Sequence, residues 1–197
     1  VKSFKRLVRH NLDLYAGGGF YRLITPCATC TSTIRKTWPM FADLFSARER
    51  EKILALADKT LDITEFLADK ISFGPKEEKC AKSGVVTYHD PCHLQKSLGI
   101  ENQPREILRA ASGYIFREMP GAESCCGMGG SFNLEHYSLS RRIGERKLKN
   151  ILAVNPDCVA TACPACMIQL MDVISRAGHT IKVRHVVQVY EQYSGDA

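Results

Sequence analysis

The sequence lacks the features of a membrane-spanning or secreted protein. Its longest apolar stretches are far shorter than the roughly 20 residues that cross a bilayer as a helix. Its first residues, VKSFKRLVRHN, are basic and have neither the apolar core nor the cleavage site of a signal peptide. The chain begins with Val rather than Met, so we expect it to be a piece of a longer protein.

Two cofactor motifs are also missing. No G-x-G-x-x-G run opens a predicted helix, so hydride chemistry would have to come from another chain that carries flavin. No C-x2-C-x2-C-x3-C-P run of the ferredoxin type is present either. The net charge of +6 is modest, and the basic helix around residues 140–149 has no interleaved aromatic residues. We interpret these charges as a solvated helix face that could meet a partner protein, and we expect no nucleic-acid binding.

Cysteine, in contrast, is abundant. The chain has nine cysteines, an odd number, and they fall in CxxC and CC clusters. A disulfide framework is therefore a poor interpretation, and a reducing compartment with metal or cluster ligation is a better one. We expect a cytoplasmic protein that meets the inner face of a membrane, if at all, through its partners.

Alternating strand and helix patterns predict an α/β fold. Expected strands are followed by helices throughout residues 84–197, which predicts a four-stranded parallel, doubly wound sheet with helices on both faces. The expected strands are 85–90, 114–120, 158–163 and 181–185, and the expected helices are 102–112, 136–154, 165–178 and 186–193. Earlier in the chain we expect a strand at 20–26, a helix through Ile34 and a single helix at 49–71.

The N-terminal third repeats part of this pattern. LITPCATC at 23–30 resembles VATACPAC at 159–166, and DITEFLADKI at 62–71 resembles RHVVQVYEQY at 184–193. We therefore expect residues 1–72 to form part of a first unit, residues 73–83 to be a linker, and residues 84–197 to form a complete second unit.

Five of the cysteines follow expected strands. Cys92, the pair Cys125–Cys126, and the pair Cys163–Cys166 lie in three loops that parallel pairing brings to one edge of the sheet. Thiolates are soft ligands that select zinc, Cu(I) or iron–sulfur clusters. A structural zinc site uses four ligands and seldom needs a CC pair, so we favour a cluster. Gly127 and its neighbours would let the CC loop approach closely, with backbone N–H groups available to cluster sulfides.

This pattern closely resembles the CCG cysteine-rich domain. Thirty-two residues separate Cys92 from Cys125, and thirty-six separate Cys126 from Cys163, within HDPCH, CCGMGGSF and CPAC. The resemblance covers 84–197 as a full copy and 20–71 as the end of another. The domain occurs in one of the subunits of heterodisulfide reductase and in iron–sulfur subunits of glycolate, lactate and glycerol-3-phosphate oxidation.

The resemblance implies electron transfer through a [4Fe-4S] cluster, which in the heterodisulfide reductase branch is non-cubane and held by five cysteines. The partners implied are a flavoprotein dehydrogenase subunit and further iron–sulfur subunits. YHDPCHLQKSLGI and CCGMGGSFNL are closer to the glycolate and lactate branch, which predicts an electron relay with no catalytic residues. A reductase that splits a disulfide at its cluster is the second hypothesis, and a zinc-stabilised interaction module is the third.

The remaining candidates are less decisive. Cys27 and Cys30 form the CxxC of the first copy, although two thiolates alone cannot hold a cluster. His89 and His93 flank Cys92 and could donate to cluster sulfur, deliver protons or cap the loop. We expect Cys158 and the Met167–Met171 pair to be core residues, His136 to cap a helix, and Cys80 to be an incidental thiol of the linker.

Overall fold

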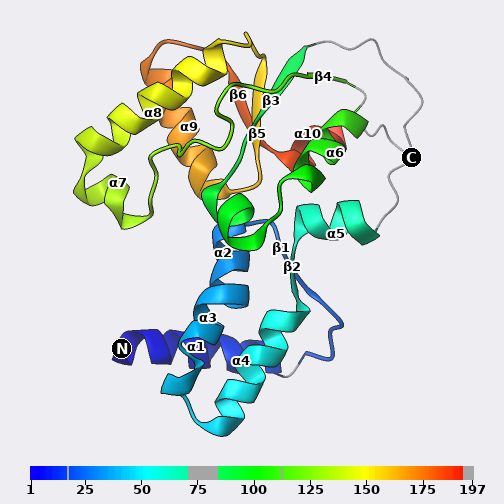
Figure 1. Ribbon diagram of the computed structural model, residues 1–197, viewed down its shortest axis with the longest axis vertical. Helices are drawn as coiled ribbons and strands as arrows, with labels where there is room; N and C mark the ends of the chain where they lie inside the picture. Colours follow the sequence, from blue (N-terminus) through cyan, green and yellow to red (C-terminus); the bar gives the residue numbers. More distant parts are fainter. Residues whose placement is uncertain (17, 71–83, 112, 193–197) are drawn as a thin grey trace. The chain divides into compact units, whose positions relative to one another are not determined.

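The computed structural model describes residues 1–16, 18–70, 84–111 and 113–192 (Figure 1). The chain divides into two compact units, Val1–Ile63 and Thr64–Ala197, which we call unit 1 and unit 2. The predicted linker, 73–83, lies outside the described residues, and so does Cys80. No helix in the described ranges is both long enough and apolar enough to cross a membrane.

Unit 1 combines helices with a two-stranded parallel sheet. Strands β1 (Leu23–Thr25) and β2 (Thr60–Asp62) pair in register from Leu23 opposite Thr60 to Thr25 opposite Asp62. The helical elements are α1 (Lys2–Ala16), α2 (Ala28–Ser32), the π-helix η1 (Thr33–Thr37), α3 (Trp38–Met40), the 3-10 helix η2 (Ala42–Leu44) and α4 (Ala47–Lys59).

The core of unit 1 is apolar and contains Trp38, the one tryptophan of the chain. Val8 and Leu12, four residues apart on α1, pack into it, which explains why the basic first segment forms an amphipathic helix. The single helix expected at 49–71 is wrong: α4 ends at Lys59, β2 follows, and α5 (Ile63–Lys70) begins after it. Pairing with β1 overrides the local helical pattern in these three residues.

Unit 2 contains the predicted four-stranded parallel sheet, in the order β4-β3-β5-β6. The strands are β3 (Val85–His89), β4 (Ile115–Phe116), β5 (Cys158–Thr161) and β6 (Lys182–His185). The helical elements that follow α5 are the π-helix η3 (His93–Ser97), α6 (Asn102–Ala110), α7 (Ser131–Glu135), α8 (Tyr137–Leu152), α9 (Pro164–Arg176) and α10 (Val186–Gln192).

The helices cover both faces of this sheet. In Figure 1, α8 and α9 lie on one side and α6 and α10 on the other. The first strand of this sheet, β3, pairs with both β4 and β5. The connection from β3 to β4 therefore runs toward one edge of the sheet, and the connection from β4 to β5 crosses back past β3 toward the other edge. Open α/β sheets bind ligands at the carboxyl ends of strands where the winding reverses in this way.

The internal repeat extends to strand register. β5 pairs with β6 so that Thr161 lies opposite His185, just as Thr25 lies opposite Asp62 in unit 1. By strand register, Asp62 thus corresponds to His185. The comparison of 62–71 with 184–193 aligns Asp62 with Arg184 instead, which is one residue away.

Several local expectations are corrected. The helix expected at 136–154 begins at Tyr137, after the separate helix α7, and His136 makes no side-chain cap. Cys158 is fully buried as expected, but Met171 is 45% exposed because it lies on the outer face of α9. Gly178 ends α9 with φ +77° and donates its N–H to the Ser175 carbonyl, as a C-terminal cap does.

Candidate metal centre

Three buried side chains form the centre of the site. The ligand atoms of His89, Cys126 and Cys166 all lie within 4.8 Å of one another. His89 ends β3, Cys126 comes from the loop after β4, and Cys166 lies in the first turn of α9. The site therefore lies at the carboxyl ends of β3 and β5, where the winding of the sheet reverses.

The other three predicted cysteines adjoin this centre. Cys125 is hydrogen-bonded to Cys126 and lies near enough to Cys92 for their charges to interact, and Cys163 is hydrogen-bonded to Cys166. Cys92 and Cys125 are exposed, whereas Cys126, Cys163 and Cys166 are buried. The structure thus brings the five predicted sulfurs together, with one side of the site open to the surface.

The thiols are electrostatically coupled. The pKa of Cys126 is lowered, because Cys125 and then Cys166 donate hydrogen bonds to its sulfur, and His89 acts in the same direction. The pKa values of Cys125 and Cys166 are raised, first by those same bonds to Cys126 and then by further thiol contacts and burial. The three thiols are thus coupled through hydrogen bonds that favour the thiolate at Cys126 over those at Cys125 and Cys166.

Gly127 fixes the CC loop against α8. Its φ is +97°, and a Cβ at this position would lie 2.4 Å from the Ser140 carbonyl oxygen. The Ser140 hydroxyl donates to the Gly127 carbonyl at 2.7 Å, and the Gly127 N–H donates to the Cys125 sulfur at 3.3 Å. Only glycine fits this close approach, and its N–H already points at a candidate ligand.

A buried polar network supports the same loop. The Gln169 amide donates to the Ser140 hydroxyl at 3.3 Å, and Asn133 donates to the Gln169 side-chain oxygen at 2.8 Å. Gly144 lets the helices approach, since a Cβ there would meet Val173 at 2.5 Å. The loop is thus held by α7, α8 and α9 together.

An ion-pair network holds the end of β3. Asp90, which is 2% exposed, accepts two hydrogen bonds from Arg105, at 2.6 and 2.9 Å. Arg105 also bonds Glu118, and its guanidinium lies 5.1 Å from the centre of the Tyr88 ring. Hydrogen bonds to Asp90 are the main reason that the pKa of Arg105 is raised. The backbone leading into Cys92 is therefore anchored before the cysteine is reached.

The two flanking histidines have different environments. His89 is 1% exposed, and its ring nitrogens have no conventional hydrogen-bond partner within the described ranges. His93 is exposed in the first position of η3. The alternation of side chains along β3 turns His89 inward, whereas the helical turn after Cys92 carries His93 outward.

In unit 1, Cys27 and Cys30 also lie at the turn from a strand into a helix, but residues 1–63 contain fewer cysteines than unit 2. Cys27 precedes α2, and its N–H donates to the Thr25 hydroxyl at 3.1 Å. The Thr31 hydroxyl donates to the Cys27 carbonyl at 3.1 Å and approaches the buried carboxylate of Asp62 at 3.5 Å. No third cysteine occurs in residues 1–63.

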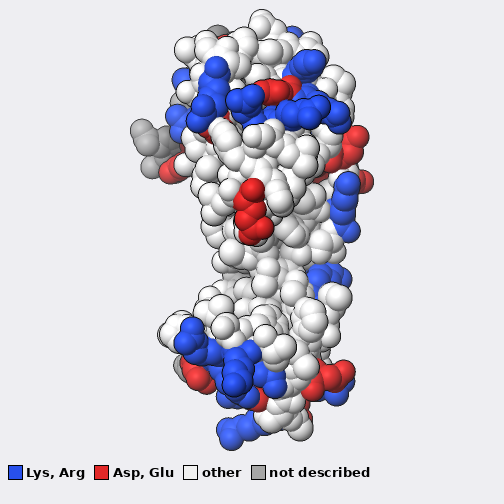
Figure 2. Space-filling view, turned by 90° about the vertical axis from the view of Figure 1, so that its left-hand side faces the viewer, with Lys and Arg blue, Asp and Glu red and all other residues white. Residues whose placement is uncertain are grey.

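Lys147 is a residue that the sequence interpretation missed. The charge pattern predicts a solvated face for this helix, yet Lys147 is 1% exposed. Lys147 lies beside the buried residues of the same helix, Ser140, Gly144, Leu148 and Ile151. Helical periodicity could therefore have indicated that Lys147 is buried. The other basic residues of α8, Arg141, Arg142, Arg146 and Lys149, are exposed, as expected. Figure 2 shows basic side chains gathered on the side of the molecule where α8 lies.

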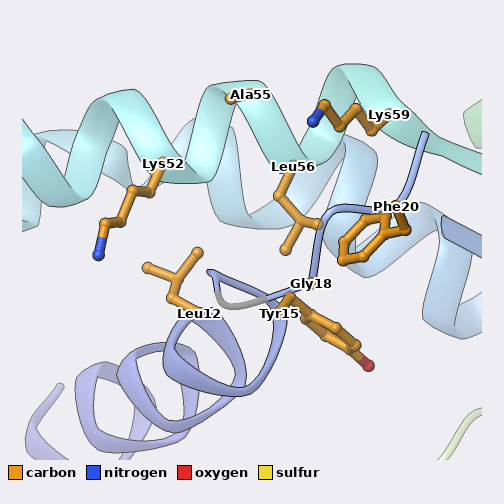
Figure 3. Close-up of a pocket in the computed structure, with 8 residues that line it drawn as sticks. All are labelled: Leu12, Tyr15, Gly18, Phe20, Lys52, Ala55, Leu56 and Lys59. Atoms are coloured by element: carbon orange, nitrogen blue, oxygen red, sulfur yellow. The ribbon is translucent and has the colours of Figure 1, made fainter. Parts of the chain in front are cut away.

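A separate pocket of about 210 Å³ lies in unit 1 between α1 and α4 (Figure 3). Its walls are mainly apolar, with Leu12 and Tyr15 from α1 and Leu56 from α4, and its rim carries Lys52 and Lys59. It contains no cysteine and no other metal-binding side chain. This pocket is therefore separate from the cysteine loops of unit 2.

Comparison with known families gives a match that covers more than half of the chain. The family described as the CCG cysteine-rich domain matches residues 1–35 and 86–171. The chain belongs to this family. The matched segments include the CxxC of unit 1 and the five cysteines of unit 2 that were predicted as ligands.

The chain is also similar to individual proteins of other organisms. The chain is 33% identical over 181 residues to one subunit of the fumarate reductase (CoM/CoB) of Methanothermobacter marburgensis, covering 90% of this chain but only 34% of that protein. It is 31% identical over 191 residues to lactate utilization protein A of a Geobacillus species, covering 96% of this chain and 77% of that protein. A further similar protein is lactate utilization protein A 2 of Bacillus mycoides, at 25% identity over 98% of this chain and 79% of that protein.

Proposed function

We propose that the chain is an iron–sulfur electron-transfer subunit of a flavin-linked dehydrogenase complex of the lactate or glycolate type. The observation that carries this proposal is the convergence of five thiols and one buried histidine at the winding-reversal edge of the unit 2 sheet. The names of the lactate utilization relatives support lactate as the class of donor.

The residues present fit a [4Fe-4S] cluster, including the non-cubane type with five thiolate ligands. The donors are soft sulfurs, and buried polar atoms beside them lack conventional hydrogen-bond partners within the described ranges: both ring nitrogens of His89 and the hydroxyl of Thr161, which lies opposite His89. We assign five residues as ligands: Cys92, Cys125, Cys126, Cys163 and Cys166.

When bound, such a cluster supplies a site that accepts and releases single electrons. The protein residues around it set its position and potential: the Gly127 N–H donates to ligand sulfur, and buried His89 restricts access from the core side. Exposed Cys92 and Cys125 mark the side on which a flavoprotein or another iron–sulfur subunit would dock. We assign the assembly to the cytoplasm, with any membrane contact made by its partners.

The test is anaerobic reconstitution of the whole chain with iron and sulfide, followed by absorption and EPR spectroscopy. Photoreduced flavin mononucleotide serves as the electron donor. We expect the protein to bind iron and sulfide, and the bound centre to be reduced by the flavin. Replacing exposed His93 with Gln should change the reduction rate by less than about tenfold. Binding of zinc in preference to iron, with no redox signal, would contradict the proposal.

A second candidate is a reductase that splits a disulfide at its cluster. It is favoured by the 33% identity to a protein whose name refers to CoM/CoB, which this chain covers over only 34% of its length. His89 or His93 would then deliver a proton to the leaving thiolate. Adding a small organic disulfide to the reduced protein distinguishes the two functions: rapid reoxidation with release of thiol supports the reductase, and no acceleration supports the relay.

A further inference from the structure

One buried cation beside the site has no dedicated counter-ion. Lys147 is 1% exposed, and its ammonium donates to the carbonyls of Gly121 at 2.8 Å and Ala122 at 2.7 Å and to the Ser124 hydroxyl at 3.3 Å. All three acceptors are uncharged. None of the salt bridges between described residues includes Lys147. A lysine is almost never buried so completely unless its charge is compensated.

The negative groups that act on Lys147 belong to the site. Burial lowers the pKa of Lys147 to about 8, and four groups oppose this effect: Asp90, Cys126, Glu123 and Cys166. The first of these, Asp90, already bonds Arg105 through both of its oxygens. Glu123 is exposed, so the buried sulfurs of Cys126 and Cys166 remain as the groups whose charge as thiolate ligands this ammonium can balance.

Lys147 bonds the segment that is itself paired with the end of β3. The Ala122 carbonyl accepts from the Lys147 ammonium and, at 3.0 Å, from the backbone N–H of Asp90. Asp90 leads into Cys92, and Ala122 leads into Cys125 and Cys126. Lys147 therefore holds the segment that leads into Cys125 and Cys126, and the Ala122 carbonyl that it bonds also accepts the backbone bond from the segment that leads into Cys92.

We propose that Lys147 positions the 121–126 segment and supplies the buried positive charge that balances the thiolates of the metal centre. This inference rests on the proposed function. A cluster held by thiolates is anionic, and its reduced form carries one more negative charge than its oxidised form. A fixed ammonium nearby stabilises the reduced form more than the oxidised form, so Lys147 raises the reduction potential.

The experiment compares Lys147→Met, Lys147→Gln and Lys147→Arg with Lys149→Met in the whole chain. Lys149 is the matched control, because it is exposed on the same helix two residues away. The Met variant removes both charge and hydrogen bonds, the Gln variant keeps donors without charge, and the Arg variant keeps charge. Circular dichroism establishes that each variant folds, and the Gln variant serves as the neutral variant should the Met variant not fold.

Two readouts are used. In metal-free protein, we expect amide exchange in residues 121–126 to be about tenfold faster in Lys147→Met than in wild type, and unchanged in Lys149→Met. In reconstituted protein, spectroelectrochemistry should show a more negative midpoint potential for the Met and Gln variants. A tenfold fall in the reduction equilibrium corresponds to about 59 mV for one electron. The Arg variant should restore most of this difference.

The outcomes separate this inference from the proposed function. Equal exchange and equal potentials in Lys147→Met and Lys149→Met would overturn the inference while leaving the iron site intact. A wild-type chain that binds no iron would contradict the proposed function and the charge-balancing role, and the exchange data would still decide the positioning role.

Discussion

The two CxxC motifs of this chain have nearly the same backbone and very different surroundings. Cys27 has φ −142° and ψ 107° before α2, and Cys163 has φ −144° and ψ 115° before α9. Each follows a short strand that pairs in parallel with the next strand in the same register. Yet Cys30 is exposed, whereas Cys166 is buried against Cys126 and His89.

The difference shows that the strand–CxxC–helix turn is a scaffold, and that neighbouring loops decide its chemistry. In unit 2, loops after β3 and β4 add three cysteines and a histidine to the CxxC. In unit 1, the buried carboxylate of Asp62 occupies the position that corresponds to His185. Residues 1–63 contain no thiol besides those of Cys27 and Cys30. Two thiolates cannot complete a four-iron cluster, so residues 1–63 by themselves do not supply a full set of sulfur ligands.

The largest contrast is expected from cysteine substitution. Cys126→Ser removes the central buried sulfur. We expect the iron bound per chain after reconstitution to fall by at least about tenfold, because loss of a residue that only supports a ligand already lowers metal affinity by about this factor. Cys30→Ser, in the equivalent motif of unit 1, should leave iron content near that of wild type. Iron and sulfide analysis makes the comparison, and equal losses in both variants would mean that unit 1 contributes ligands.

Gly127→Ala should destabilise unit 2 without removing a thiol. The new Cβ would contact the Ser140 carbonyl at 2.4 Å in a residue with positive φ, so we expect a loss of about 2–4 kcal/mol in the free energy of unfolding. Gly99→Ala is the control, since Gly99 also has positive φ but has open space around it, and should cost about 1 kcal/mol.

Urea unfolding of metal-free protein followed by circular dichroism measures the effect of these glycine substitutions. Trp38 fluorescence reports on unit 1 separately, because Trp38 is buried in the unit 1 core. Similar losses for both glycine substitutions would show that the CC loop can move away from α8.

Removal of iron should loosen unit 2 locally and leave unit 1 unchanged. The bound cluster would tie three loops together, so its removal should speed amide exchange in residues 125–130 by about tenfold. The buried strand β3 and the β1–α2 turn should exchange as before, because backbone pairing holds them. Mass-spectrometric exchange on chelated and reconstituted protein tests this. Equal protection of residues 125–130 in both states would contradict it.

The smallest effect concerns acid stability in unit 1. Glu49 completes a capping box with Ser46 at the start of α4, and its pKa is lowered to about 2, chiefly by its hydrogen bond from Arg9 and then by Ser46. Because the folded-state pKa lies below the ordinary value of 4.5, Glu49 stabilises unit 1 above pH 4.5, and this contribution is lost as the pH falls through about 2.

The Glu49→Gln variant should therefore melt slightly below wild type near pH 6, and the difference should shrink below pH 4.5 and vanish near pH 2. Trp38 fluorescence during heating measures it. A difference in melting temperature that stays constant from pH 6 to about pH 2 would show that the effect of Glu49→Gln does not arise from the lost charge. The cysteine loops of unit 2 should be unaffected.

Much of this fold was predictable because its signals are local and repeated. Alternation of apolar strands and amphipathic helices indicated the parallel sheet, and the strand–CxxC–helix repeat indicated the relation between the two units. β2 was missed, since Thr60–Asp62 continue a helical pattern and become a strand only through pairing with β1. The break between α7 and α8 was missed because it depends on how the CC loop packs.

The sequence by itself determined the number and kind of candidate soft ligands and, through parallel pairing, the edge of the sheet on which their loops emerge. Tertiary structure decided which of them lie inside. Cys126 is buried beside Cys125, Cys166 and His89, in the loop that Gly127 packs against Ser140, whereas Cys92 and Cys125 are exposed. Lys147 is buried because its periodic position on α8 faces the carbonyls of Gly121 and Ala122. The direction of a side chain in an irregular loop depends on contacts with distant residues, which spacing along the chain does not encode.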